Sequence, residues 1–122
     1  LSWDAVEAAA SDISDCRNVV LHEFAHQLDG ENGSVEGAPI LPNPSRYVAW
    51  ARILGREYEQ LRRDTALGRP TDLDQYGATS PAEFFAVATE CFFTRPDSLR
   101  TRHPELYDEL RRYYRSDPMT WQ

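Results

Sequence analysis

The sequence predicts a mainly α-helical domain, and three observations support this prediction. Apolar residues recur every three or four positions along several segments, which is the period of one face of an α-helix. Serine, aspartate and proline stand where these segments begin, and glycine or proline stands where they end. The sequence also has no internal repeat and no strong signal for a β-hairpin.

Two helices are expected in the first part of the chain. A short, alanine-rich helix covers Asp4–Ala10. A second helix covers Cys16–Leu28, is capped by Asp15 and ends at Asp29–Gly30, where glycine suits the C-terminal position. The stretch from Glu31 to Pro44 is rich in Gly, Pro, Asn and Ser and lacks periodicity. We therefore expect a long surface loop there.

A long helix is expected to begin at Ser45 and to end before Gly68 and Pro70. Its apolar residues are spaced by three and four positions. They are Tyr47, Trp50, Leu54, Tyr58 and Leu61. A second loop, Thr71–Thr79, follows this helix.

The next helix has the strongest start signal in the chain. Ser80 is a favourable cap, Pro81 occupies the first helical position, and Glu83 follows the cap by three residues. An apolar stripe marks the face that we expect to be buried. It consists of Phe84, Val87, Ala88, Cys91 and Phe92. Pro96 breaks this helix, and a last helix begins at Pro104.

Length and composition restrict the class of protein. The 122 residues form one domain by size, and 41% apolar residues are enough for a core. A net charge of −7 argues against nucleic acid as a partner, and no apolar run approaches the length of a membrane span. Cys16 and Cys91 do not form a disulfide framework, so we expect reduced thiols, Cys91 in the core, and a cytoplasmic protein.

The segment His22-Glu23-Phe24-Ala25-His26 predicts a metal centre. Residues four positions apart lie on the same face of a helix, so His22 and His26 can both reach one zinc ion. Glu23 projects beside this pair and can act on a water molecule, which is the HExxH pattern of zinc peptidases. The alternative is a surface helix with two solvated histidines. Apolar neighbours disfavour it, because they indicate a half-buried helix in which each imidazole nitrogen needs a partner.

A catalytic zinc ion needs a third protein ligand. The sequence offers several candidates: Asp29, Glu83, Glu90, His103 and the two cysteines. Asp29 lies at a helix end and is expected to orient one of the histidines instead. His103 is expected to be a solvated loop residue. Glu90 is expected either to stand behind a metal ligand as its hydrogen-bond partner or to form an ion pair. Glu83 shares a helix face with Glu90 but also suits the capping box with Ser80, so the residues leave its role open.

HEFAHQLDG, followed by YGATSPAEFFAVATECFF, resembles the glucose-regulated metallopeptidases of the Mlc titration factor A family. The resemblance runs along nearly the whole chain, and a more remote one connects it with the catalytic domain of anthrax lethal factor. It implies one Zn²⁺ held by His22, His26 and Glu83, with Glu23 as the catalytic glutamate. It also implies that the Tyr76 phenol points at the active site.

The resemblance further implies a zincin-like helical core in which the HExxH helix meets a downstream glutamate helix. Family members are longer, so residues 1–122 are expected to be the C-terminal, catalytic part of an α+β domain without its N-terminal strands. The expected function is zinc-dependent hydrolysis of peptides or proteins, in an aminopeptidase-like manner. The alternative is a regulatory module with a weak or vestigial zinc site that binds a transcriptional repressor. A structural zinc site is disfavoured, because such sites are closed by four ligands.

Overall fold

The computed structural model of the chain describes residues 18–30 and 38–120. These ranges contain five α-helices, two short 3-10 helices and no strand. They are α2 (Val19–Gly30), α3 (Pro44–Ala66), η1 (Gln75–Ala78), α4 (Pro81–Thr94), α5 (Pro96–Arg102), α6 (Pro104–Tyr114) and η2 (Pro118–Thr120). The prediction of a mainly α-helical chain is confirmed. The helix expected over Asp4–Ala10 lies outside the described residues.

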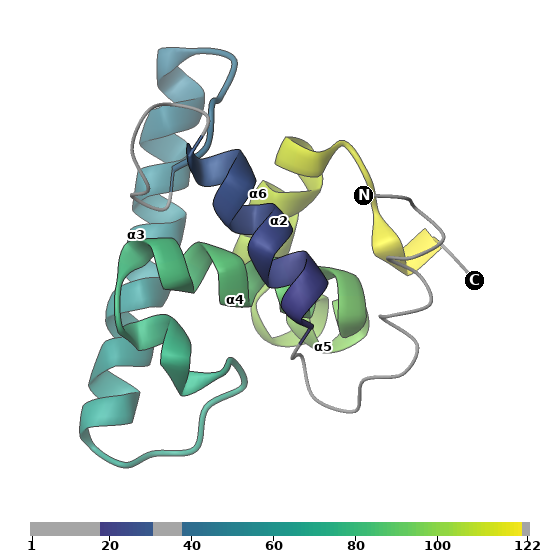
Figure 1. Ribbon diagram of the computed structural model, residues 1–122. Coiled ribbons are helices and arrows are strands. Elements are labelled where there is room, and N and C mark those ends of the chain that lie inside the picture. The colour runs from purple at the N-terminus through teal and green to yellow at the C-terminus, as the bar shows by residue number, and fades with distance from the viewer. Residues whose placement is uncertain (1–17, 31–37, 121–122) are drawn as a thin grey trace.

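Helix α4 is the centre of the bundle. It packs against α2, α3, η1, α5 and α6, and Figure 1 shows it in the middle of the molecule, with α3 to one side. Every residue from Phe84 to Phe93 is buried. The sequence predicts one buried stripe for this helix, but its neighbours surround it and all its faces are covered. Helix α4 can therefore hold side chains in fixed positions toward α2.

Aromatic rings join α3 and α6 to this central helix. The ring centroids of Phe85 and Trp50 lie 5.5 Å apart, and those of Phe92 and Tyr107 lie 5.1 Å apart. Such pairs add about 0.5–1.5 kcal/mol each to the free energy gained by burial. The buried Thr89 hydroxyl also forms a 2.8 Å hydrogen bond with the Tyr114 hydroxyl. These contacts fix the side of α4 that faces away from α2.

The helix ends follow the predicted capping chemistry with small differences. Ser80 Oγ accepts the Glu83 N–H at 3.2 Å, as predicted. Helix α3 begins at Pro44, one residue before the expected Ser45, because Asn43 supplies the cap. After α3 the chain turns at Gly68, whose φ of +69° lies in the region that glycine adopts most easily.

Two elements differ more clearly from the sequence prediction. Helix α2 begins at Val19 instead of Cys16, because the Asn18 side chain accepts the Leu21 N–H at 3.1 Å and caps the helix there. Helix α5 is not predicted at all. Pro96, which is expected only to break the preceding helix, occupies the first position of α5, where its missing N–H costs nothing.

The expectation for the cysteines is wrong in one respect. Cys91 is buried in the core as predicted, but it is disulfide-bonded and is not a reduced thiol. The cysteines therefore no longer favour a reducing compartment. None of the described helices has the length and apolar character that crossing a membrane requires.

Candidate metal centre

The two histidines of the HExxH segment lie at the edge of the buried face of α2. The buried residues of this helix, Leu21, Ala25 and Asp29, are spaced by four positions, and α2 packs against α4. His22 and His26 each follow one of these residues by one position, so both imidazoles are half-buried on the same side of the helix. Their ring centroids lie 4.8 Å apart.

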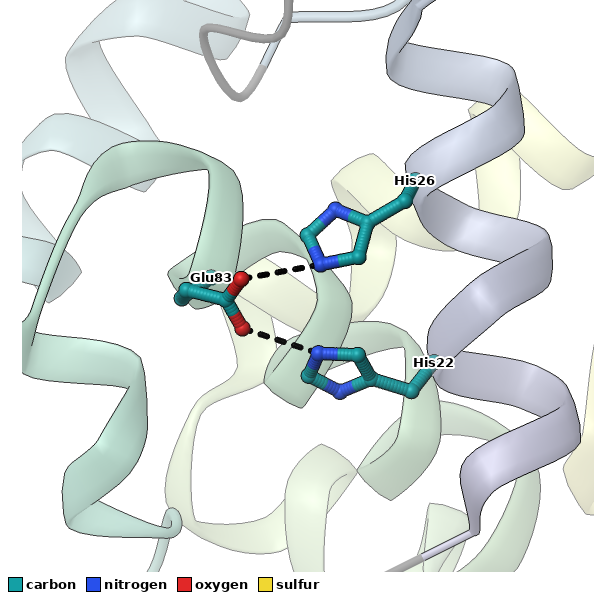
Figure 2. Close-up of side chains that lie close together, drawn as sticks. All are labelled: His22, His26 and Glu83. Atoms are coloured by element: carbon teal, nitrogen blue, oxygen red, sulfur yellow. Dashed lines mark hydrogen bonds and ion pairs between the residues drawn. The ribbon is translucent and has the colours of Figure 1, made fainter.

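Glu83 reaches both imidazoles from the first turn of α4, as Figure 2 shows. Its Oε2 lies 2.8 Å from His22 Nε2, and its Oε1 lies 3.0 Å from His26 Nε2. The bond to the Ser80 cap uses the backbone N–H of Glu83. Capping therefore leaves the carboxylate available, and the side chain lies against the histidines.

The donor set of these three side chains fits a zinc ion. Their ligand atoms all lie within 4.8 Å of one another, and two donors that share a zinc ion stand at most about 4 Å apart. The donors would therefore have to move somewhat closer together around a bound ion. Three protein ligands leave a fourth position for water, as catalytic zinc sites do. No other group of His, Cys, Asp or Glu in the described part of the chain is arranged to hold a metal.

Glu90 lies behind His22, on its other ring nitrogen. Its Oε1 is hydrogen-bonded to His22 Nδ1, and its Oε2 accepts the Asn18 N–H at 2.6 Å. Burial raises the pKa of Glu90. Burial also acts to lower the pKa of His22, but the hydrogen bonds to Glu90 and Glu83 outweigh it and the pKa is raised. Asn18 is not among the residues that the sequence singles out, although asparagine before a helix is a favoured cap.

Glu23 lies on the exposed side of α2, next to His22 in the sequence. Within residues 18–30 and 38–120 its carboxylate takes part in no hydrogen bond or ion pair. The carboxylate is open to solvent and comes from the residue that follows the candidate ligand His22.

Tyr76 lies beside the metal centre on η1. Its ring centroid is 6.2 Å from that of His22, and 54% of the residue is exposed. The adjacent Gly77 is buried, and a Cβ at this position would lie 3.2 Å and 3.3 Å from side chains of α3 and α4. The close packing of η1 against these two helices restrains the backbone from which the Tyr76 side chain extends.

Asp29 does not orient a histidine, contrary to the sequence prediction. Its buried carboxylate accepts the Ala38 N–H at 3.2 Å. His22 Nδ1 is bonded to Glu90 instead, and the buried His26 Nδ1 has no hydrogen-bond partner among the described residues. Asp29 therefore connects the end of α2 with the segment that leads to α3.

His103 lies away from the metal centre, as expected, but it is not a solvated loop residue. Only 19% of its side chain is exposed. Its Nδ1 lies 2.9 Å from a Glu57 oxygen and its Nε2 lies 3.0 Å from an Asp72 oxygen. His103 thus joins α3 to the loop before η1.

The helical fold thus brings His22, His26 and Glu83 together in a group that could hold a metal ion. Residues 1–115 match the family described as glucose-regulated metallo-peptidase M90. The chain belongs to this family.

Relatives of the chain are found in several bacteria. An uncharacterized protein of Synechocystis is 42% identical over 119 residues, which are 98% of this chain and 43% of that protein. Mlc titration factor A of Edwardsiella ictaluri is 40% identical, over 88% of this chain and 43% of the relative. Mlc titration factor A of Serratia proteamaculans is 38% identical, over 98% of this chain and 45% of the relative. The chain thus spans less than half of the length of these relatives.

Proposed function

We propose that this chain forms the zinc-binding core of a metallopeptidase that hydrolyses peptide bonds. The observation that supports the proposal most directly is the position of the Glu83 carboxylate. It lies against Nε2 of both histidines, although 61 residues separate it from His22 in the sequence. In this proposal His22, His26 and Glu83 hold one Zn²⁺ per chain. Membership in a metallo-peptidase family supports it independently.

Glu23 is the general base of the proposed reaction. Bound zinc supplies Lewis acidity, which lowers the pKa of a water molecule toward about 7. Glu23 accepts the proton of that water as its oxygen attacks the peptide carbonyl, and it then gives the proton to the leaving amine. The exposed carboxylate of Glu23 suits this task, because it has no competing partner in the described part of the chain.

Tyr76 stabilises the charge that develops on the carbonyl oxygen. Its hydroxyl donates a hydrogen bond to the oxyanion of the tetrahedral intermediate, and one such donor contributes roughly 3–4 kcal/mol in another hydrolase. The ring lies beside His22 and is half exposed, so that a substrate is able to reach it.

The substrate is proposed to be a peptide or a protein. Aminopeptidase-like cleavage, implied by the family resemblance, stays a prediction, because no described residue points to capture of a free amine. The cytoplasmic location also stays a prediction, and the disulfide at Cys91 gives it no support.

Metal analysis and a cleavage profile on a peptide library test this function. We expect one zinc ion per purified chain, and cleavage that a chelator abolishes and added zinc restores. A His22→Ala/His26→Ala double variant serves as the metal-free control. A wild-type chain that binds no metal, or that cleaves peptides equally well without it, would contradict the proposal.

A regulator-binding module with a weak or vestigial zinc site is the second candidate. The name Mlc titration factor A, carried by several relatives, favours it. It predicts that the chain retains purified Mlc in a pull-down even when Glu23 is replaced by glutamine. Peptide cleavage that depends on Glu23, together with no retention of Mlc, would leave the peptidase as the better account.

A further inference from the structure

Glu90 is a buried carboxylate to which the proposed hydrolysis assigns no task. Only 6% of the residue is exposed. It lies on α4 seven positions after Glu83, and residues at this spacing share a helix face. Its two oxygens hold different parts of α2. Oε1 is bonded to the ring of His22, and Oε2 to the backbone N–H of Asn18.

We propose that Glu90 is the positioning residue for the zinc ligand His22. It acts through two hydrogen bonds, of which one orients the imidazole and the other fixes the start of the helix that carries it. The inference rests on the proposed function, in which His22 binds zinc.

The bond to the ring determines which nitrogen is available to a metal. A neutral imidazole carries one proton, and only the nitrogen without it has a lone pair to offer. An ionised Glu90 accepts a hydrogen bond and so keeps the proton on Nδ1. Nε2, the nitrogen that faces Glu83, is then the one that can give up its proton and offer a lone pair to a metal. A carboxylate in this position also makes the ring a stronger donor to the metal.

The bond to Asn18 holds the first turn of α2 in place. The Asn18 side chain accepts the Leu21 N–H at 3.1 Å, and its carbonyl accepts the His22 N–H at 2.9 Å. Glu90 Oε2 accepts a hydrogen bond from the backbone N–H of Asn18 at 2.6 Å. The turn that carries His22 is therefore attached to α4 both through its backbone and through the imidazole.

The two histidines are consequently not equivalent. His26 has no counterpart to Glu90, because its buried Nδ1 has no hydrogen-bond partner in the described ranges. His22 is oriented by α4 through both ring nitrogens before any metal binds, whereas the hydrogen-bonding contact of the His26 ring within the described residues is the one from its Nε2 to Glu83. One helix thus supplies both the third ligand, Glu83, and the residue that aims the first ligand.

The test measures zinc affinity in Glu90→Gln and Glu90→Ala by competition with a chromophoric chelator. Glu109→Gln is the matched control, because Glu109 is also a buried glutamate but lies on α6 and pairs with Arg46. We expect Kd to rise about 10- to 100-fold in Glu90→Ala, the range found for such partners of metal ligands. The Kd of Glu90→Gln should lie between those of wild type and Glu90→Ala, because the single amide oxygen cannot accept both hydrogen bonds. Glu109→Gln should stay within about twofold of wild type.

A second readout does not require zinc or activity. In the zinc-free chain, NMR exchange of the His22 Nδ1 proton with water should be slow in wild type and Glu109→Gln, and fast in Glu90→Ala. Unchanged exchange and unchanged zinc affinity in both Glu90 variants would overturn the proposal, and so would an equal loss of affinity in Glu109→Gln. If Glu90→Ala fails to fold, the zinc affinity and proton exchange of Glu90→Gln decide whether the proposal holds. A wild-type chain without zinc affinity would contradict the peptidase function, while the exchange measurement would still decide whether Glu90 orients the ring.

Discussion

Glu83 Oε2 lies 2.8 Å from His22 Nε2, across 61 residues of sequence. The contact joins the first turn of α4 to the first turn of α2, and it depends on the packing of these two helices. The same carboxylate lies 3.0 Å from His26. Substitution of Glu83 is therefore the most direct test of the proposed ligand set.

Glu83→Ala should lower zinc affinity on the order of 100-fold or more, because removal of a ligand costs more than removal of a partner behind a ligand. The Ser80 cap should survive, since it uses the backbone N–H of residue 83. Zinc content after dialysis measures the effect. Glu105→Ala is the control, because Glu105 lies in the first turn of α6 and pairs with Arg56. Stoichiometric zinc in Glu83→Ala would show that the third ligand is wrong.

Glu23→Gln should keep zinc but lose turnover. The amide has nearly the same shape as the carboxylate and cannot accept the proton of the attacking water. General-base catalysis contributes roughly 10²- to 10⁴-fold, so kcat should fall by this amount. Peptide cleavage and zinc content are measured on the same preparation, with the exposed Glu59→Gln on α3 as the control. Wild-type activity in Glu23→Gln would refute the assignment of the base.

Tyr76→Phe should lower kcat roughly 10²- to 10³-fold with little change in KM, because the hydroxyl contacts the substrate mainly in the transition state. Steady-state kinetics separate the two constants. Tyr58→Phe is the control, since the Tyr58 ring packs against Phe84 in the core. A rise in KM at constant kcat would instead assign Tyr76 to substrate binding.

Local signals explain which parts of the site are predictable from the sequence. The spacing of His22 and His26 places them on one helix face whatever the rest of the chain does. The Ser80 cap and the adjacent proline likewise define the start of α4. Spacing cannot choose between Glu83 and Glu90, because both lie on the same face of α4. The packing of α2 on α4 distinguishes the two glutamates, because it places Glu83 at Nε2 of His22 and Glu90 at Nδ1.

The wrong predictions concern features with little local signal in the sequence. His103 has a loop-like neighbourhood in the sequence, but its partners Glu57 and Asp72 are 46 and 31 residues away. Helix α5 has only seven residues and begins with a proline, so it has little periodicity to reveal it. The disulfide at Cys91 has no local signature either.

His103 and Asp72, which contact each other, should make the free energy of unfolding depend on pH in opposite directions. The hydrogen bond to Glu57 raises the pKa of His103 above its ordinary 6.5, and burial opposes this only in part. Burial acts to raise the pKa of Asp72, but hydrogen bonds from Arg102 and His103 bring it below 3.8. The contribution of Asp72 is present above pH 3.8 and is lost as pH falls through its lowered pKa. The contribution of His103 to the free energy of unfolding is complete below pH 6.5 and is lost as pH rises through the raised pKa of His103.

Urea unfolding of wild type and His103→Gln between pH 5 and 9 measures this contribution. The difference in free energy of unfolding should be largest at the acid end and should shrink as His103 loses its proton. Titrations elsewhere, including that of His22, cancel in the difference. A difference that is independent of pH would show that His103 is not charged in the folded chain.

Gly77→Ala should destabilise the chain because an added methyl group would be crowded against side chains of α3 and α4. The added Cβ would lie 3.2 Å from Leu61 Cδ2 and 3.3 Å from Val87 Cβ, so either the core or η1 has to move. Overpacking of this kind costs about 1–3 kcal/mol. Gly55→Ala is the matched control, since a Cβ on α3 at this position has nothing within 4 Å and should stabilise the helix by roughly 0.5–1 kcal/mol. Urea unfolding of both variants measures the contrast. Opposite signs are expected, and equal effects would show that the packing of η1 does not depend on Gly77.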